Sequence, residues 1–152
     1  MKELITSFIG LTKANLTWFH AAHHLTKGTG FAGDHVTLFG EIYQEILEVF
    51  DELVERSIVL CDDEHVASPL VLSNLASTVL SNYPEPSNKS GDEIAMFALD
   101  LTREYISVTE EVYRILESNR FLSLGMDDFL GSTAGKFEKF EYLIGQRVKK
   151  GY

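Results

Sequence analysis

The stretch WFHAAHHLTKGTGFAGDH, residues 18–35, joins two segments of helical periodicity. Apolar side chains recur every three or four positions over residues 2–26, and the same pattern returns over residues 34–61. Three glycines interrupt the pattern, and Asp34 stands where a helix N-cap is expected. The stretch therefore predicts two long amphipathic helices that are connected by a turn.

The rest of the chain continues the helical pattern. Residues 92–118 and 126–148 each carry an apolar face at helical spacing. Residues 69–81 predict a short helix, because Ser68 followed by Pro69 is a helix start signal.

The connection between the second and third long helices is too long for a tight hairpin. After the short helix, the turn-forming sequence NYPEPSNKSG ends that segment. Four long helices with one long crossover are typical of ferritin-like connectivity. We therefore predict an all-α, ferritin-like four-helix bundle that forms a single domain over residues 1–152.

Composition narrows the possible partners. Acidic residues outnumber Lys and Arg by 23 to 13, which gives a net charge of −10 and argues against binding to DNA. The basic ending RVKKGY is short and is interpreted as a solvated end. No apolar run approaches the roughly 20 residues that span a membrane, and the first residues lack a signal-peptide pattern. The single Cys61 fits a reducing compartment, so we expect a cytoplasmic protein.

The histidines restrict where a metal could bind. A two-metal site inside one bundle typically needs a Glu-x-x-His motif on each of two helices. No glutamate of this chain has a histidine three residues later, and all five histidines lie within the first 65 residues. A site of that type within one chain is therefore excluded.

The directions of the histidines differ on a helical wheel. At about 100° per residue, His23 lies among the apolar side chains of the first helix. It is interpreted as a core or near-core histidine with a satisfied nitrogen. His24 points about 140° away from that direction, and His20 flanks it at the i,i+4 spacing.

The outer face of the second helix is acidic. Glu41, Gln44, Glu48, Asp51 and Glu55 follow one another at spacings of three and four. A solvated face is the simplest interpretation, but like charges one turn apart repel by a few tenths of a kcal/mol per pair. A bound cation or an apposed histidine offsets this repulsion.

Asp51, Glu55 and His24 all point outward from their own bundle. Imidazole together with carboxylate suits Fe(II), Mn or Zn. If these residues bind one metal, the simplest geometry takes the histidine from one chain and the carboxylates from a two-fold mate. The pattern therefore predicts a homo-oligomer with the metal between subunits.

Residues 24–58, HLTKGTGFAGDHVTLFGEIYQEILEVFDELVERSI, resemble the signature of the Dps family of small ferritins. The shared features are a histidine late in the first helix, a Gly/Phe-containing turn, a second histidine and an Asp-x-x-x-Glu-Arg close, here DELVER. The short crossover helix and the last helix, MDDFLGSTAGKFEKFEYLI, fit the same family. The general pattern is also similar to that of ferritin-like proteins of unassigned function in large tailed phages.

The resemblance implies a function and a set of ligands. Members of the family assemble from two-fold dimers into a hollow dodecamer, oxidise Fe(II) with hydrogen peroxide and store ferric mineral. Carried over to this chain, His24 and His35 of one subunit, with Asp51 and Glu55 of another, hold iron; Zn or Mn are other possible metals. Secondary candidates for ligands are Glu41, Glu48 and His20.

Two departures from the family pattern leave a second function open. His35 stands one position early relative to Asp51. The acidic ligand expected one turn after that histidine has no match, because the position is Gly40 or Phe39, and Glu41 is the nearest carboxylate. The alternative is a ferritin-like bundle that keeps the assembly without the chemistry and acts as a structural or interaction protein.

Overall fold

The computed structural model describes residues 1–150, which contain helices and no strand. The elements are α1 (Lys2–Leu25), α2 (Phe31–Gly33), η1 (Asp34–Leu38), α3 (Phe39–Cys61), η2 (Glu64–Ala67), α4 (Pro69–Leu80), α5 (Gly91–Ser118) and α6 (Leu124–Val148). The all-α prediction is confirmed. Across the described range, no helix combines the length and the apolar character that crossing a bilayer requires.

The helices fall into two compact units, one of residues 1–89 and one that begins at Ser90. The single domain over residues 1–152 stays a prediction. The basic ending RVKKGY falls partly outside the described residues, since Gly151 and Tyr152 are not among them.

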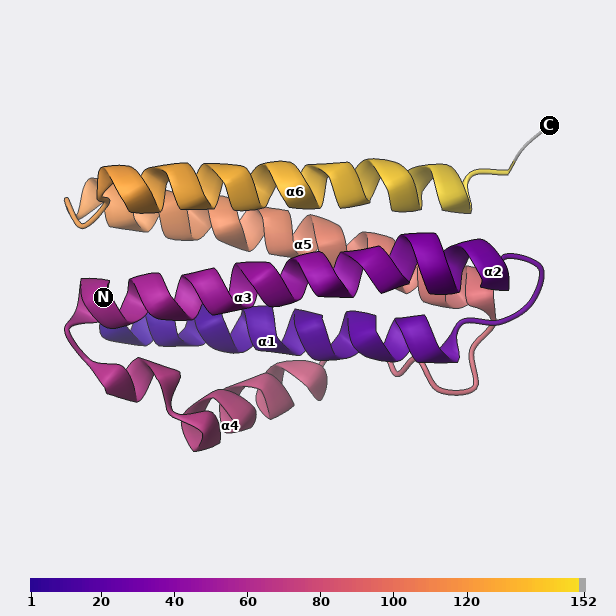
Figure 1. Cartoon of the computed structure of the whole chain (residues 1–152), viewed down its shortest axis with the longest axis horizontal. Helices are drawn as coiled ribbons and strands as arrows, with labels where there is room; N and C mark the ends of the chain where they lie inside the picture. The colour runs from indigo at the N-terminus through magenta and orange to yellow at the C-terminus, as the bar shows by residue number, and fades with distance from the viewer. Residues whose placement is uncertain (151–152) are drawn as a thin grey trace. The chain divides into compact units, whose positions relative to one another are not determined.

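In the first unit, α1 runs antiparallel to α3, and α4 packs against α1 (Figure 1). The apolar faces predicted from the sequence are the buried ones, and burial of each large apolar side chain stabilises the fold by about 1.5–3 kcal/mol. The largest fully buried side chains of this unit are Phe19, Phe39, Ile5, Ile9, Ile42, Ile46 and Leu53.

The connection between α1 and α3 differs from the prediction. Helical structure resumes at α2, so the second helical segment begins at Phe31 rather than at Asp34. The prediction of Asp34 as an N-cap is wrong, because the backbone is already helical at Gly30 and Asp34 lies inside η1, whose N-cap is Gly33. Asp34 is instead buried, and the Thr26 hydroxyl donates a hydrogen bond to its carboxylate at 3.4 Å.

A wide π turn, η1, leads from α2 into α3. Its mark is the N–H of Phe39, which donates to the carbonyl of Asp34 five residues earlier. An α-helix closes this bond over four residues, so a π turn contains one residue more per turn than the α-helix around it. The following helix is thereby rotated relative to the residues before the turn.

The crossover begins where α3 ends, with Asp62 in the left-handed conformation at φ 48°. The short helix η2 follows, which the sequence did not predict, and the Asp63 carboxylate caps it by accepting a hydrogen bond from the N–H of His65 at 2.9 Å. The Ser68 hydroxyl then caps α4, with Pro69 in the first turn. The predicted helix over 69–81 is confirmed to within one residue.

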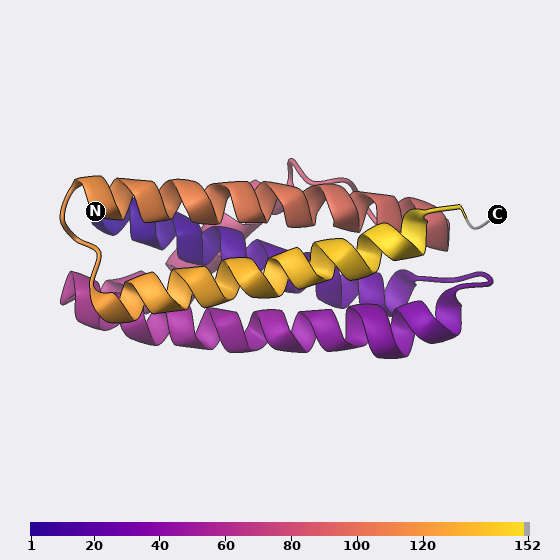
Figure 2. The same cartoon turned by 90° about the horizontal axis from the view of Figure 1, so that it is seen from above.

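In the second unit, α5 and α6 form an antiparallel hairpin (Figure 2). Ser90 and Glu93 form a capping box at the start of α5, and Ser123 caps α6. The stacked rings of Tyr105 and Phe137, with centroids 4.0 Å apart, lie in the apolar contact between the two helices. The predicted helices over 92–118 and 126–148 are observed with starts one and two residues earlier.

Candidate metal centre

Four of the five histidines gather where the end of α1 meets η1 and the start of α3. The rings of His23 and His35 are stacked, with centroids 4.0 Å apart and planes 10° from parallel. The rings of His20 and His24 lie 4.5 Å apart. Tyr43 on α3 contacts His20 at 4.5 Å and His23 at 5.1 Å. The four histidine rings and the Tyr43 ring thus form one aromatic cluster at the end of α1.

His23 and His35 are joined by two reciprocal hydrogen bonds. The Nδ1 of His23 lies 2.5 Å from the His35 carbonyl oxygen, and the Nδ1 of His35 lies 2.6 Å from the His23 carbonyl oxygen. A carbonyl oxygen only accepts, so both rings carry their proton on Nδ1. In the neutral form, each Nε2 therefore keeps its lone pair available for a metal, an arrangement that is common behind metal-ligating histidines.

The electrostatics of His23 favour this neutral form. Burial lowers the pKa of His23 below its usual value, and the neighbouring imidazoles lower it further, although the bond to the His35 carbonyl raises it in part. His23 is half-buried, and its Nδ1 is bonded. The expectation of a near-core histidine with a satisfied nitrogen is confirmed.

Gly40 lies against this pair. A Cβ at position 40 would stand 2.6 Å from the carbonyl oxygen of His35 and 3.3 Å from Nδ1 of His23. The first distance is far inside van der Waals contact, so any side chain at this position must displace the π turn or the histidine pair. The glycine that replaces the expected acidic ligand therefore has a structural cause.

The π turn also accounts for the one-residue offset of His35. Sixteen residues of regular α-helix would place the side chains of His35 and Asp51 about 160° apart around the axis. If the wide turn absorbs one of those residues, the angle falls to about 60°. The turn therefore brings His35 toward the face of α3 that carries Asp51.

The acidic face predicted on the second helix lies on α3 and is exposed. Asp51 and Glu55 are both exposed, and neither has an ion-pair partner among the described residues. With Glu48, Glu52 and Arg56 they line an open groove of about 520 Å³. Arg56 pairs with Glu52 in the i,i+4 geometry at 2.8 Å.

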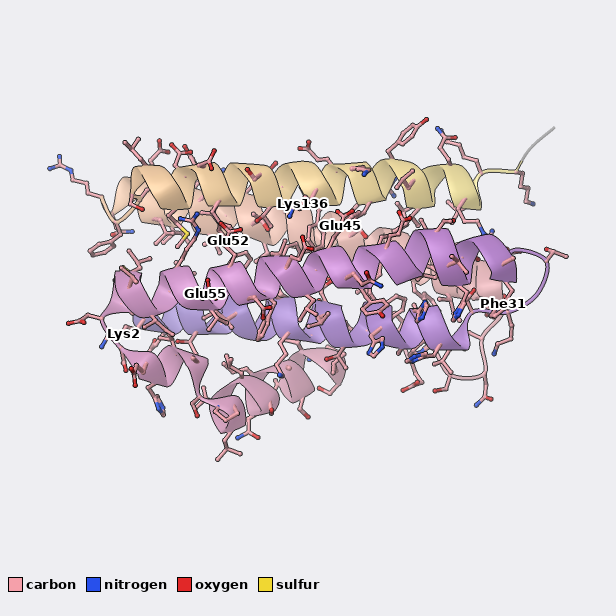
Figure 3. All side chains as sticks on the ribbon, in the orientation of Figure 1. Lys2, Phe31, Glu45, Glu52, Glu55 and Lys136 are labelled. Carbon is pink, nitrogen blue, oxygen red and sulfur yellow. The ribbon has the colours of Figure 1, made fainter. Side chains whose placement is uncertain are left out.

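The histidines and the carboxylates lie at different levels of the same helix pair. Tyr43, which contacts the histidine cluster, precedes Asp51 by eight residues, which is about 12 Å along a helix. In Figure 3, Phe31 lies at one end of this unit, and Glu52 and Glu55 lie toward the other. Within residues 1–150 of one chain, no three His, Cys, Asp or Glu side chains converge to hold a metal.

The remaining predicted ligands occupy both regions. His24 and His20 are exposed at the end of α1, and Glu48 lies in the acidic groove. Glu41 is exposed on the first turn of α3, next to Gly40. His35 is half-buried against Phe31, whose ring stacks on it at 5.0 Å.

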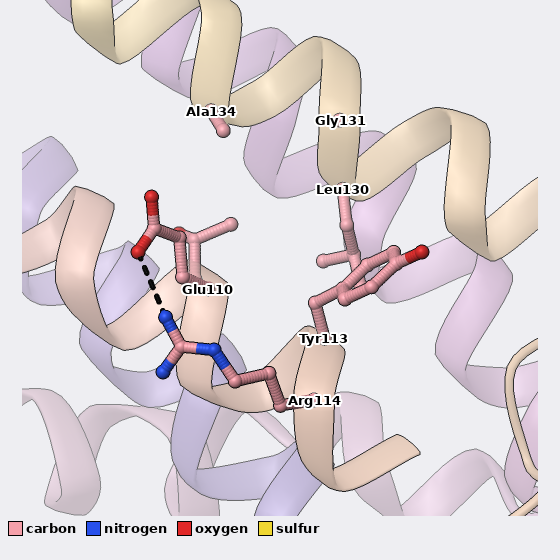
Figure 4. A pocket seen from close by; sticks show the side chains of 7 residues that line it. Glu110, Tyr113, Arg114, Leu130, Gly131 and Ala134 are labelled. Atoms are coloured by element: carbon pink, nitrogen blue, oxygen red, sulfur yellow. Dashed lines mark hydrogen bonds and ion pairs between the residues drawn. The ribbon is translucent and has the colours of Figure 1, made fainter. Parts of the chain in front are cut away.

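The second unit holds a separate cavity of about 370 Å³ between α5 and α6 (Figure 4). Arg114 and Glu110 form an ion pair at 3.1 Å in its wall. The charge of Asp127 raises the pKa of Tyr113, so this phenol stays protonated at neutral pH.

Cys61 is buried, and burial raises the pKa of its thiol. The thiolate is the nucleophilic form of cysteine, so this environment does not activate it.

Sequence reasoning missed the reciprocal pairing of His23 and His35. Its signal was the offset of His35 by one position, which a π turn explains. A second signal was the placement of the two histidines on either side of a turn between antiparallel helices, which brings them to the same level.

No known protein-family model matches the chain. No curated protein matches its sequence. Among solved structures, the chain is similar to the tetragonal form of Mycobacterium smegmatis Dps, with a TM-score of 0.75 and 16% sequence identity over 99% of this chain and 86% of that chain. The chain therefore has a Dps-like ferritin fold, and the predicted ferritin-like helical architecture with a short crossover helix is confirmed.

Proposed function

We propose that this protein binds Fe(II) between subunits, oxidises it with hydrogen peroxide and stores the ferric product. The observation that carries the proposal is the exposed carboxylate pair Asp51 and Glu55, one turn apart in an open acidic groove without an ion-pair partner among the described residues. Oxygen and imidazole donors suit Fe(II). The Dps-like fold supports the same function.

The two halves of the site come from different subunits. His24 and His35 of one chain supply imidazole nitrogens, and Asp51 and Glu55 of a two-fold mate supply carboxylates. The separation of about 12 Å between the level of Tyr43 and that of Asp51 supports this division, because one chain leaves its own histidines and carboxylates apart. A two-fold dimer contains two such sites, and dimers assemble further into a closed dodecamer.

Iron is the substrate in this proposal. One peroxide molecule takes one electron from each of two Fe(II) ions and, with two protons, leaves two molecules of water. The protein binds the Fe(II) ions, orients them and holds the carboxylate charges that favour the ferric product. The buried Cys61 supports a cytoplasmic location for this chemistry.

Gly40 supports the alternative function, a ferritin-like assembly that serves as a structural or interaction protein. The close contact of position 40 with His35 and His23 leaves no room for the acidic ligand that the family pattern places there. In this alternative the oligomer forms, but iron oxidation is no faster than in buffer. Glu41 or Glu48 supplies the missing carboxylate only in the first proposal.

One experiment separates the two functions. Fe(II) is added anaerobically to the purified protein, peroxide follows, and ultraviolet absorbance reports ferric product. We expect oxidation faster than in buffer, and a large loss of rate for Asp51→Asn and Glu55→Gln. Glu138→Gln, on the exposed face of α6, is the matched control and retains the rate.

Native mass determination accompanies this assay. A rate equal to that of buffer, in a protein that still assembles, favours the structural function. A monomer removes the basis for any site between subunits.

A further inference from the structure

We propose that His20 and His24 form a second metal site, contained within one chain, that chelates Cu²⁺ and, more weakly, Ni²⁺. The site needs neither a second subunit nor the carboxylates of α3. It shares His24 with the proposed iron site, but it does not rest on the iron-oxidising function.

The spacing of the two histidines is that of a helical chelate. His20 and His24 are four residues apart on α1, so their side chains project from the same face one turn apart. Two histidines at this spacing on a helix are an established means of gripping a divalent transition metal. Both side chains are exposed. The ring nitrogens of His20 and those of His24 have no hydrogen-bond partner among the described residues.

The distance between the rings lies within the range expected for two imidazoles on one metal. With a metal–nitrogen bond of about 2.0–2.1 Å, each ring centroid lies about 3.2 Å from the metal. Two rings then have centroids about 4.5 Å apart at a right angle and about 5.2 Å apart at a tetrahedral angle. The observed separation of His20 and His24 is 4.5 Å, with planes tilted by 49°.

A right angle between two imidazoles favours neighbouring positions of a tetragonal metal. Cu(II) and Ni(II) adopt square-planar or tetragonal geometry with nitrogen ligands, whereas Zn(II) prefers a tetrahedron. Affinity for a given nitrogen site also increases from Ni(II) to Cu(II) and falls again at Zn(II). The imidazole ligands and this order of affinity therefore favour copper first, with water in the remaining positions.

The surrounding rings hold the chelate in place. Tyr43 packs on His20 at 4.5 Å, and the ring of His23 lies 5.2 Å from that of His24. The Nδ1 of His23 is bonded to the carbonyl of His35, and the His23 ring lies 6.4 Å from that of His20. His23 therefore packs against the two-histidine site, and within residues 1–150 no three His, Cys, Asp or Glu side chains form a group that could hold a metal.

The test is titration calorimetry of the whole, metal-free protein with CuSO₄. We expect one Cu²⁺ per chain at this site, and affinity at least tenfold lower for His20→Ala and for His24→Ala. The order of affinity is Cu²⁺ over Ni²⁺ over Zn²⁺. His65→Ala, which removes the exposed histidine of η2, is the matched control and leaves the affinity within twofold.

Electron paramagnetic resonance of the Cu²⁺ complex gives an independent readout. We expect hyperfine coupling to two imidazole nitrogens, reduced to one in either alanine variant. Circular dichroism without metal checks the fold, and His20→Gln replaces His20→Ala if the latter unfolds. Copper affinity of His20→Ala and His20→Gln within twofold of the wild type overturns the proposal, as does an equal loss in His65→Ala. Failure of the iron assay leaves these copper results unchanged, so the two proposals fail separately.

Discussion

The imidazoles of His23 and His35 each donate Nδ1–H to the backbone carbonyl of the other residue, at 2.5 and 2.6 Å, while their rings stack at 4.0 Å. This pair ties the last turn of α1 to the π turn that opens the next helix. One relationship therefore sets the tautomers of two histidines and accounts for the glycine at position 40.

The pair should behave as one energetic unit. We expect His23→Ala and His35→Ala each to lower the free energy of unfolding by about 1–3 kcal/mol, because each leaves a half-buried carbonyl without its partner. In the double variant the losses should fall short of additivity by about 0.5 kcal/mol or more. Urea unfolding of the four proteins measures the coupling. Additive losses would show that the two bonds contribute independently, and a cycle of His24→Ala with His35→Ala serves as the uncoupled control.

Glycine at position 40 should be required by contact rather than by backbone conformation. Gly40→Ala places a Cβ 2.6 Å from the His35 carbonyl, so we expect a loss of about 1–3 kcal/mol in unfolding free energy. Gly135→Ala on α6 has open space around its Cβ and should gain about 0.5–1 kcal/mol from helix propensity. Urea unfolding compares the two. Equal effects of the two substitutions contradict the contact argument.

Asp63 should stabilise the crossover only in its charged form. The hydrogen bond from the N–H of His65, and then the Lys2 ammonium, lower the pKa of Asp63 below its usual value of 3.8. The folded state therefore favours the carboxylate, and its contribution is complete above the unfolded pKa and lost as pH falls through 3.8 toward the folded pKa.

The measurement for Asp63 is the difference in unfolding free energy between wild type and Asp63→Asn from pH 6 to pH 2.5. We expect the difference to shrink as the solution becomes acidic. Lys2→Gln should keep part of this pH dependence, because the bond from the N–H of His65, the largest single cause of the lowered pKa, remains. A difference that stays constant with pH refutes the assignment.

The capping box should set the start of α5. Ser90→Ala removes the hydroxyl that accepts a hydrogen bond from the N–H of Glu93 at 3.1 Å, and we expect a loss of about 1 kcal/mol. Ser73→Ala, at an exposed position inside α4, is the control and should change stability by less than about 0.5 kcal/mol. Thermal unfolding and amide exchange near Gly91 report the effect. Unchanged exchange there would mean that the helix start is fixed by other contacts.

Some features were determined by the sequence alone. Apolar spacing over residues 2–26, 92–118 and 126–148 predicted the long helices, because a helix that must bury one face shows its period in any window. Ser68 and Pro69 likewise predicted the start of α4, because a helix start signal is contained in a few neighbouring residues. The outward direction of Asp51 and Glu55 also followed from spacing, and both are exposed.

Other features were decided only by the tertiary structure. The sequence placed Asp34 at a helix cap, but contact with Thr26 turned its carboxylate inward. His23 and His35 meet because α1 and α3 are antiparallel, a relation between residues twelve positions apart that local periodicity does not contain. The helical period of the sequence predicts which face of a helix each residue occupies. The reciprocal histidine bonds, the π turn and the close contact at Gly40 arise only when two helices are brought into contact.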